Sequence, residues 1–370
     1  MTAARLGGTR PGSVRVTRSR RSNRWSWLVA IVVIGALGYL PYATDSGTTA
    51  VMVNFFILLT MAAMWNLLAG YAGLVSVGQQ VFVGLGAYTV LVLAQNGFSP
   101  FAAIPVAAIV CGALALPISW LVFRLRGGYF AIATWVVADV AQLLVSKVPQ
   151  LGGGTGAALP GLFNIDPAWI TAYTYWASLA VAVASLGAIY VVLRSRVGLA
   201  LTAIRDNEVG ARSVGVQVSL AKRIVYAVSG AGAGAAGALV AVSQLNVQAA
   251  SVFSVQWSAY MIFVVIIGGI GSIEGPILGA ILFFVLQQSL SQYGAWYLIV
   301  VGLIAIVVAL WAPRGLWGVI SDRFHVSLFN TGYWLWPGTN GPNETGAVSK
   351  SDGQSATAGG EDAAEAEAAT

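Results

Sequence analysis

Four polar side chains stand within or beside long apolar runs and are the best candidates for contact with a solute. Asp139 lies inside one apolar run. Ser76, Gln79 and Gln80 follow a glycine-rich stretch that interrupts two others. Neutral amides, a hydroxyl and freed backbone groups suit a small polar or zwitterionic molecule. A carboxylate inside hydrocarbon is costly unless it faces a cavity or a partner. We therefore predict that these four residues line a solute path.

Each of these assignments has an alternative. Asp139 could bind a substrate amino group, relay a proton, or pair structurally with helix donors, and a protonated form fits each role. The apolar runs contain no Lys or Arg that could pair with it. Gln79 and Gln80 could instead serve packing between helices, which the glycines beside them favour.

Residue types also limit the chemistry. The chain has one histidine, His325, far from the other polar residues, and one cysteine, Cys111, inside an apolar run. Triads and histidine-based metal sites are therefore nearly excluded. A phosphate-binding GxxxxGK[ST] loop is also absent from the sequence. We predict no catalytic residues, no metal and no cofactor.

The polar segment 194–223 carries six basic and two acidic residues between two long apolar regions. From Gly198 to Gly215 its pattern predicts a short helix, a polar turn at Arg205–Glu208, and a second short helix. Such helices could fit a groove on a soluble partner, or they could lie on anionic lipid. Physical reasoning alone leaves both interpretations open.

The elements that must position these residues are membrane helices. Hydrophobic residues make up 58% of the chain and charged residues 9%, and the mean hydropathy is +0.79. These values predict an all-α polytopic integral membrane protein. About ten transmembrane or re-entrant helices are expected over the apolar runs at 25–43, 50–69, 81–96, 101–123, 129–146, 172–193, 224–244, 258–271, 276–291 and 295–312.

The distribution of basic residues predicts the orientation. With the N-terminus in the cytoplasm and ten crossings, only Lys147 of the 19 basic residues falls outside. Eight crossings with two re-entrant hairpins satisfy the same parity. Both termini are then cytoplasmic. Residues 25–315 form the membrane domain, with 194–223 as a cytoplasmic loop. The tails, 1–24 and 316–370, are expected to be disordered, the first basic and the second acidic at its end.

Two glycine-dense segments are predicted to break helices. Their residues either free backbone for a solute path or let helices approach closely, and the pair is also compatible with an internal repeat. Glu274 is expected to cap the helix that begins near Pro276. The break residues are Gly70, Gly73 and Gly78 in the first segment, and Gly268, Gly271, Gly275 and Pro276 in the second.

The same segments carry a family resemblance. The chain resembles the LivM-like permease subunits of bacterial ABC importers for branched-chain amino acids, a family that also contains urea-type permeases. The likeness lies in NLLAGYAGLVSVGQ at 66–79, GLGAY at 84–88, GGYFAIAT at 127–134, GLALTAIRDNEVGARSVGV at 198–216 and GGIGSIEGPILGA at 268–280.

The resemblance implies a bacterial inner membrane as the location, and it implies partners. These are a second homologous permease, two cytoplasmic ATPases and an extracytoplasmic solute-binding protein, with membrane lipid around the helices and no nucleic acid. It also favours a soluble partner for the segment 194–223, through a degenerate Glu-Ala-Ala-x-x-x-Gly docking motif. Gly210 departs from the alanine of that motif and Glu208 is displaced from its glutamate. The residues expected to couple to the ATPases are Arg205, Asp206, Glu208, Gly210, Ala211 and Gly215.

This resemblance implies a permease without enzymatic activity of its own, and it predicts a clear effect of substitution. Replacing Gly215, or reversing the charges of Arg205 and Glu208, should abolish transport and ATPase stimulation without preventing membrane insertion. Two rival functions remain open. One is a proton-coupled secondary transporter that uses Asp139, and the other is a urea or amide permease of the same family.

Overall fold

The computed structural model describes residues 15–17, 23–162, 166–290, 294, 296–312, 314–324 and 334–336. The chain divides into two units. The first comprises 1–18 and 333–370, and in it Arg15–Thr17 (β1) pairs antiparallel with Trp334–Trp336 (β4). The second, Ser19–Gly332, contains the helices. Most of the two predicted tails, and His325, lie outside the described residues.

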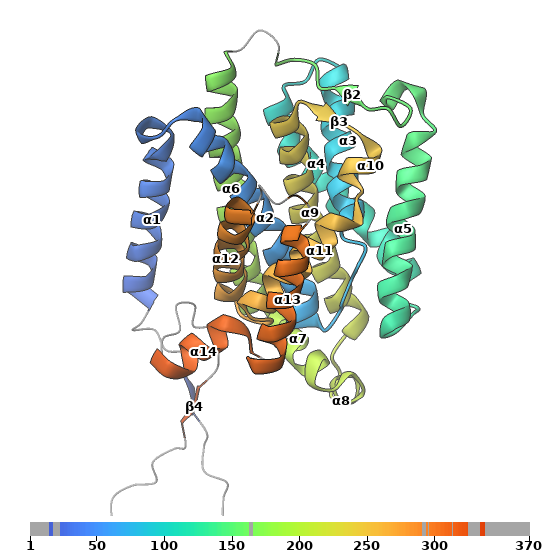
Figure 1. Cartoon of the computed structure of the whole chain (residues 1–370). Coiled ribbons are helices and arrows are strands. Elements are labelled where there is room, and N and C mark those ends of the chain that lie inside the picture. The colour runs from blue at the N-terminus through green and yellow to red at the C-terminus, as the bar shows by residue number, and fades with distance from the viewer. Residues whose placement is uncertain are drawn as a thin grey trace, which may run out of the picture. The chain divides into compact units, whose positions relative to one another are not determined.

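The second unit is helical, apart from one short strand pair between Ala157–Ala158 (β2) and Asn246–Val247 (β3) (Figure 1). Its helices are α1 (Asn23–Ala43), α2 (Ser46–Asn66), the π-helical turn η1 (Leu67–Tyr71), α3 (Gln80–Gln95), α4 (Pro100–Val122), α5 (Gly128–Ser146), the 3-10 turn η2 (Pro149–Leu151), α6 (Pro167–Arg194), α7 (Arg196–Asp206), α8 (Glu208–Ser213), α9 (Val218–Gln244), α10 (Ala249–Val252), α11 (Val255–Gly268), α12 (Glu274–Leu290), α13 (Trp296–Trp311) and α14 (Gly315–Phe324).

The predicted all-α polytopic class is confirmed. Each of the ten apolar runs falls on a helix, because a continuous apolar run without charges can satisfy its backbone in hydrocarbon only as a helix. Among the described residues, six helices are long and apolar enough to cross a membrane, or seven if the bent pair α13–α14 forms one span. The predicted ten crossings are not confirmed, since α3 and α12 are shorter.

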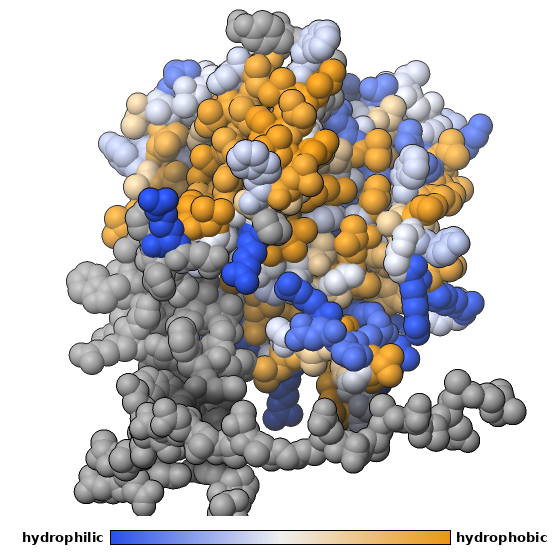
Figure 2. All heavy atoms as spheres, turned by 60° about the horizontal axis from the view of Figure 1, so that its bottom comes forward, coloured by the Kyte–Doolittle hydropathy of each residue, from blue (hydrophilic) through white to orange (hydrophobic). Residues whose placement is uncertain are grey.

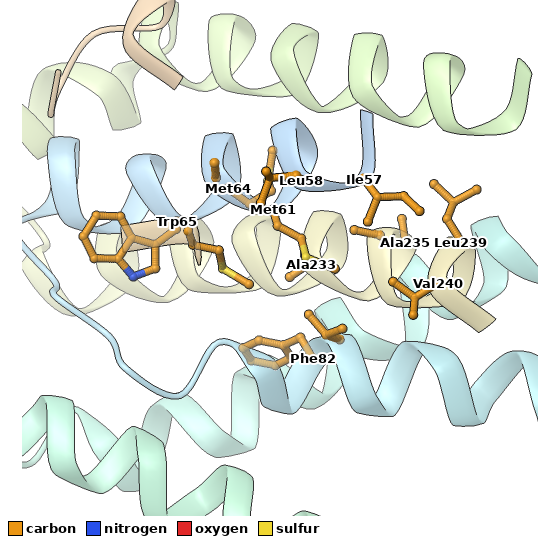
Figure 3. Packing of buried hydrophobic residues seen from close by; sticks show 14 of the residues in the cluster. Ile57, Leu58, Met61, Met64, Trp65, Phe82, Ala233, Ala235, Leu239 and Val240 are labelled. Atoms are coloured by element: carbon orange, nitrogen blue, oxygen red, sulfur yellow. The ribbon is translucent and has the colours of Figure 1, made fainter. Parts of the chain in front are cut away.

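Helix α9 forms the centre of the unit, where it packs against α2, α3 and α4. Close approach is possible because small residues face one another. A Cβ atom on Gly86 of α3 would lie 2.0 Å from the carbonyl oxygen of Gly234, and one on Gly237 would lie 2.0 Å from that of Val83. Figure 3 shows how Phe82 of α3 and Met61 of α2 point toward the small side chains of α9.

The helices α7, α8 and α14 lie at one end of the bundle, with Arg124 and Arg126 in a neighbouring loop; we call this the basic end (Figure 1). In Figure 2, hydrophilic side chains gather there with hydrophobic ones among them, whereas the flank of the bundle is mainly hydrophobic. At this end α7, α8 and the start of α9 share a small core of their own, formed by Ile204, Ala211, Val218 and Ala221.

Candidate functional site

After η1 the chain leaves helical conformation and runs through residues 72–79 to the start of α3. Gly73 takes a φ of +67°, which an L side chain rarely adopts. The indole Nε1–H of Trp65 donates to the carbonyl oxygen of Ser76 at 2.7 Å. A Cβ atom on Gly78 would lie 1.9 Å from the carbonyl oxygen of Thr134 in α5. The unwound segment is thus held between α2 and α5.

Gln79 and Gln80, at the end of this segment, are fully buried inside the subunit. The Nε2–H of Gln79 donates to the hydroxyl of Ser229 in α9 at 2.5 Å, and that hydroxyl donates to the carbonyl oxygen of Met64 at 2.8 Å. The Oε1 of Gln80 accepts from the hydroxyl of Ser258 in α11. Among the described residues, Oε1 of Gln79 and Nε2 of Gln80 have no hydrogen-bond partner. Each amide therefore uses one half of its capacity.

Asp139 lies apart from this group. It is exposed on α5, on the face opposite Phe130, Thr134 and Ala138, which are the buried residues of that helix. α5 is the least buried of the six candidate spans, because only 17% of its most apolar stretch is buried within the subunit. Ser76, with 1% of its surface exposed, belongs with Gln79 and Gln80. The structure therefore brings together three of the four predicted path residues and leaves the fourth on an outer face.

The two predicted helix breaks meet at the basic end. Asn66, the last residue of α2, donates through Nδ2 to the carbonyl oxygen of Ser272 at 2.7 Å. Its Oδ1 accepts from the backbone N–H of Gly271 at 2.9 Å. A Cβ atom on Gly70 would lie 2.6 Å from the backbone nitrogen of Gly271. The turn between α11 and α12 thus rests directly on η1.

The second break is built by backbone-to-backbone packing. A Cβ atom on Gly268 would lie 1.9 Å from the carbonyl oxygen of Gly275. α12 begins at Glu274, with Pro276 in its first turn. The Ser272 hydroxyl accepts from the N–H of Gly275 at 3.0 Å and so caps this helix. Glu274 lies in the first turn as expected. These close approaches agree with the packing interpretation of the glycines.

The polar segment folds into two short helices with a turn between them, as the pattern predicted. Asn207 forms the turn, where its Oδ1 accepts from the N–H of Gly210 at 2.9 Å and caps α8. Glu208 forms ion pairs of 2.8 Å with Arg212 and with Lys222. The hydrogen bond from Lys222, together with both positive charges, lowers the pKa of Glu208. Asp206 is exposed at the end of α7.

The end of α8 explains two residues of the predicted docking motif. Ala211 has 3% of its surface exposed and belongs to the small core. Gly215 has a φ of +85°. The N–H of Val216 donates to the carbonyl oxygen of Ala211 at 3.0 Å, and that of Gly215 to Arg212 at 3.1 Å, which is a Schellman ending. Ala211 therefore belongs to the packing of the segment, and Gly215, which is exposed, allows the turn that ends α8.

Arg205 is exposed like its neighbours Asp206 and Asn207, but the end of its side chain contacts η1. Its Nη1 donates to the carbonyl oxygen of Gly70 in η1 at 2.8 Å. The large apolar side chains that do point outward are Leu199, Val209 and Val214, with exposed fractions of 46%, 75% and 77%. The sequence grouped Arg205 with the docking residues, whereas the structure joins it to the first helix break.

Sequence reasoning missed Asn66, Ser229, Ser258 and Ser272 as polar contacts of the site. Isolated polar residues within or at the end of apolar runs were the available signal, since a buried polar group in a membrane helix needs a partner. Among the described residues, no group of three or more His, Cys, Asp and Glu side chains could hold a metal ion.

Comparison with known proteins identifies the family. The family described as "Branched-chain amino acid transport system / permease component" matches residues 47–309, so the chain belongs to it. The chain is similar to the high-affinity branched-chain amino acid transport system permease protein LivM of Escherichia coli, with 27% identity over 78% of this chain and 74% of the relative. The LivM protein of Salmonella typhimurium is 28% identical over the same shares. No solved structure matches the chain significantly.

Proposed function

We propose that this chain is the permease subunit of an ABC importer that moves branched-chain amino acids, or a related small polar solute, across the bacterial inner membrane. Partner subunits hydrolyse the ATP. The observation that carries the proposal is the family match, which extends from the start of α2 almost to the end of α13. The printed names of both relatives, which describe branched-chain amino acid transport, support the solute class.

The surfaces of the subunit support the partners that the family implies. Two ATPases drive the pair of permeases, and one of them docks on α7 and α8 of this subunit, which form a small folded unit with its own core at the basic end. The basic side chains support a cytoplasmic position for this end. A second homologous permease covers the outer face of α5, where Asp139 cannot remain against lipid at low cost. An extracytoplasmic binding protein delivers the solute to the opposite end.

The solute path in this proposal has two parts. Asp139 faces the space shared with the second permease. Ser76, Gln79 and Gln80 are buried inside the subunit, and the unpaired Oε1 of Gln79 and Nε2 of Gln80 become available to the solute when the segment 72–79 moves. Support comes from the burial of these amides, because an unpaired buried polar group is costly and calls for an explanation.

Reconstitution tests the proposal. The chain is co-expressed with a second permease, two ATPases and a binding protein from the same organism, and uptake of radiolabelled leucine into proteoliposomes is followed. We expect uptake that requires enclosed ATP and the loaded binding protein. Uptake that ignores ATP and collapses with the proton gradient would instead indicate a secondary transporter using Asp139. Competition by excess urea or an amide, without competition by isoleucine or valine, would assign the other solute class.

A further inference from the structure

Arg205 occupies the point where α7 meets both helix breaks. Its Nη1 donates to the Gly70 carbonyl oxygen at 2.8 Å. A Cβ atom on Gly271 would lie 2.8 Å from the same nitrogen, so the guanidinium is seated against a position that has no side chain. The side chain thus reaches from the polar segment into the membrane domain.

The carbonyl that Arg205 binds has been freed by the π-helical turn. In a continuing α-helix the N–H of Leu74 would donate to the Gly70 carbonyl oxygen. Here the N–H of Leu74 donates to Leu68 at 3.0 Å instead. A cationic donor at a helix C-terminus is also favoured by the helix dipole. The contact with Arg205 therefore satisfies a carbonyl at the exact place where the helix gives way to the unwound segment.

The other side of the polar segment is different in character. Leu199, Val209 and Val214 point outward, whereas Leu201 is buried in the main core and Ile204 in the small core of α7, α8 and α9. An apolar outward surface suits a groove on a protein partner. Arg205 is also exposed, but the end of its side chain is bonded to the Gly70 carbonyl oxygen in η1. Docking and transmission can therefore belong to different residues of the same two helices.

We propose that Arg205 is the positioning residue through which movement of α7 and α8 reaches the unwound segment 72–79. The inference rests on the proposed ATPase docking. Force passes from α7 through Arg205 to the Gly70 carbonyl, and from η1 into the segment that ends at Gln79. Asn66 carries the same movement to the turn before α12, because it bonds both Gly271 and Ser272. Arg205 itself does not contact the ATPase.

The test uses the complete reconstituted importer and compares Arg205→Gln with Arg205→Lys. Three quantities are measured: ATPase subunits that co-purify, solute uptake, and ATP hydrolysed per solute. We expect Arg205→Gln to retain the ATPases and to lower uptake by about five- to 150-fold, the range typical of coupling between two sites. ATP hydrolysis should continue, so the amount of ATP hydrolysed per solute molecule taken up should rise. Arg205→Lys, which can still donate to the carbonyl, should recover part of the uptake.

Two further variants serve as controls. Arg196→Gln removes an exposed arginine from the first turn of the same helix and should leave all three quantities unchanged. Val209→Asp places a charge on the outward surface and should lower co-purification of the ATPases. This pattern would separate docking from transmission.

Three results bear against the inference, and they are distinguishable from failure of the proposed function. Normal uptake by Arg205→Gln would overturn it. So would loss of the ATPases from Arg205→Gln, since Arg205 would then belong to the docking surface. If Arg196→Gln lost as much uptake as Arg205→Gln, the effect would come from removing any positive charge from α7. Failure of the proposed function itself would appear in the unaltered protein, as uptake without any need for ATP.

Discussion

Gly210 and Gly215 lie within one short helix and its ending, but an added methyl group affects them in opposite ways. Gly210 is helical, and a Cβ atom would meet Asn207 at an ordinary 3.4 Å. Gly210→Ala should therefore stabilise α8 by up to about 1 kcal/mol, the difference in helix propensity. Gly215→Ala forces alanine into the left-handed region and should cost about 1–2 kcal/mol.

Limited proteolysis within 194–223 measures both changes on the folded protein. Slower cleavage of Gly210→Ala and faster cleavage of Gly215→Ala are expected. Equal rates for the two variants would contradict the roles given to these glycines. In that case, the glycine that replaces the alanine of the docking motif at position 210 would not act through its weaker helix propensity.

Glu208 makes the attachment of α8 to α9 dependent on pH. The hydrogen bond from Lys222 and the charges around it lower the pKa of Glu208 below its ordinary value of 4.5. Because the folded pKa is the lower one, the stabilisation is present above the unfolded pKa and is lost as the pH falls through the folded pKa. Cleavage within 194–223 should accelerate over that interval. In Glu208→Gln this acceleration should disappear, and Asp206→Asn, at an exposed residue nearby, should retain it.

At the scale of elements, the contact between α3 and α9 depends on the absence of side chains. Gly86→Ala would place a methyl group 2.0 Å from the Gly234 carbonyl oxygen, so the helices must separate. Overpacking of this kind costs about 1–3 kcal/mol. Gly187 in α6 has no atom within 4 Å of the added Cβ and is the matched control. The midpoint temperature of thermal unfolding in detergent should therefore fall for Gly86→Ala. For Gly187→Ala it should stay unchanged or rise.

A similar loss of stability in both variants would contradict this account of the interface. It would mean that alanine is unfavourable at either helix for reasons unrelated to contact. An unchanged unfolding temperature of Gly86→Ala would show that α3 and α9 are not in the close contact described here.

Across the whole molecule, the positions of the helices could be predicted from the sequence, but which side of each helix is buried could not. Apolar runs fix membrane helices because hydrocarbon leaves the backbone no other partner. The outward position of Asp139 could not be predicted, because α5 has apolar residues on every side and its periodicity carries no direction. The meeting of Asn66 with Gly271 joins residues 205 positions apart, a distance that no local pattern encodes. Gln79 and Gln80 were identified, but their burial against Ser229 of α9 and Ser258 of α11 joins segments that are far apart in the sequence.

The outer face of α5 leads to the last prediction, at the scale of the assembly. Asp139 lies among exposed apolar residues such as Val136, Val140 and Leu143, in a helix that its own subunit hardly covers. If the second permease packs there, Leu143→Cys should form cross-links to that subunit when a matching cysteine is provided. Ile109→Cys on α4, also exposed, should not, because lipid covers that face. The natural Cys111 is fully buried and should not interfere.

Asp139→Leu completes this experiment, because it removes the charge without touching the interior of the subunit. We expect the midpoint temperature of thermal unfolding of the isolated variant subunit to remain unchanged or rise, because an exposed carboxyl group contributes nothing to the fold within the subunit. Uptake by the assembled importer should fall. Cross-linking at Leu143→Cys in this background separates the two possible causes: retained cross-links place Asp139 on the solute path, whereas lost cross-links place it in the contact between permeases. Cross-linking at Ile109→Cys alone would contradict the assignment of α5 to either role.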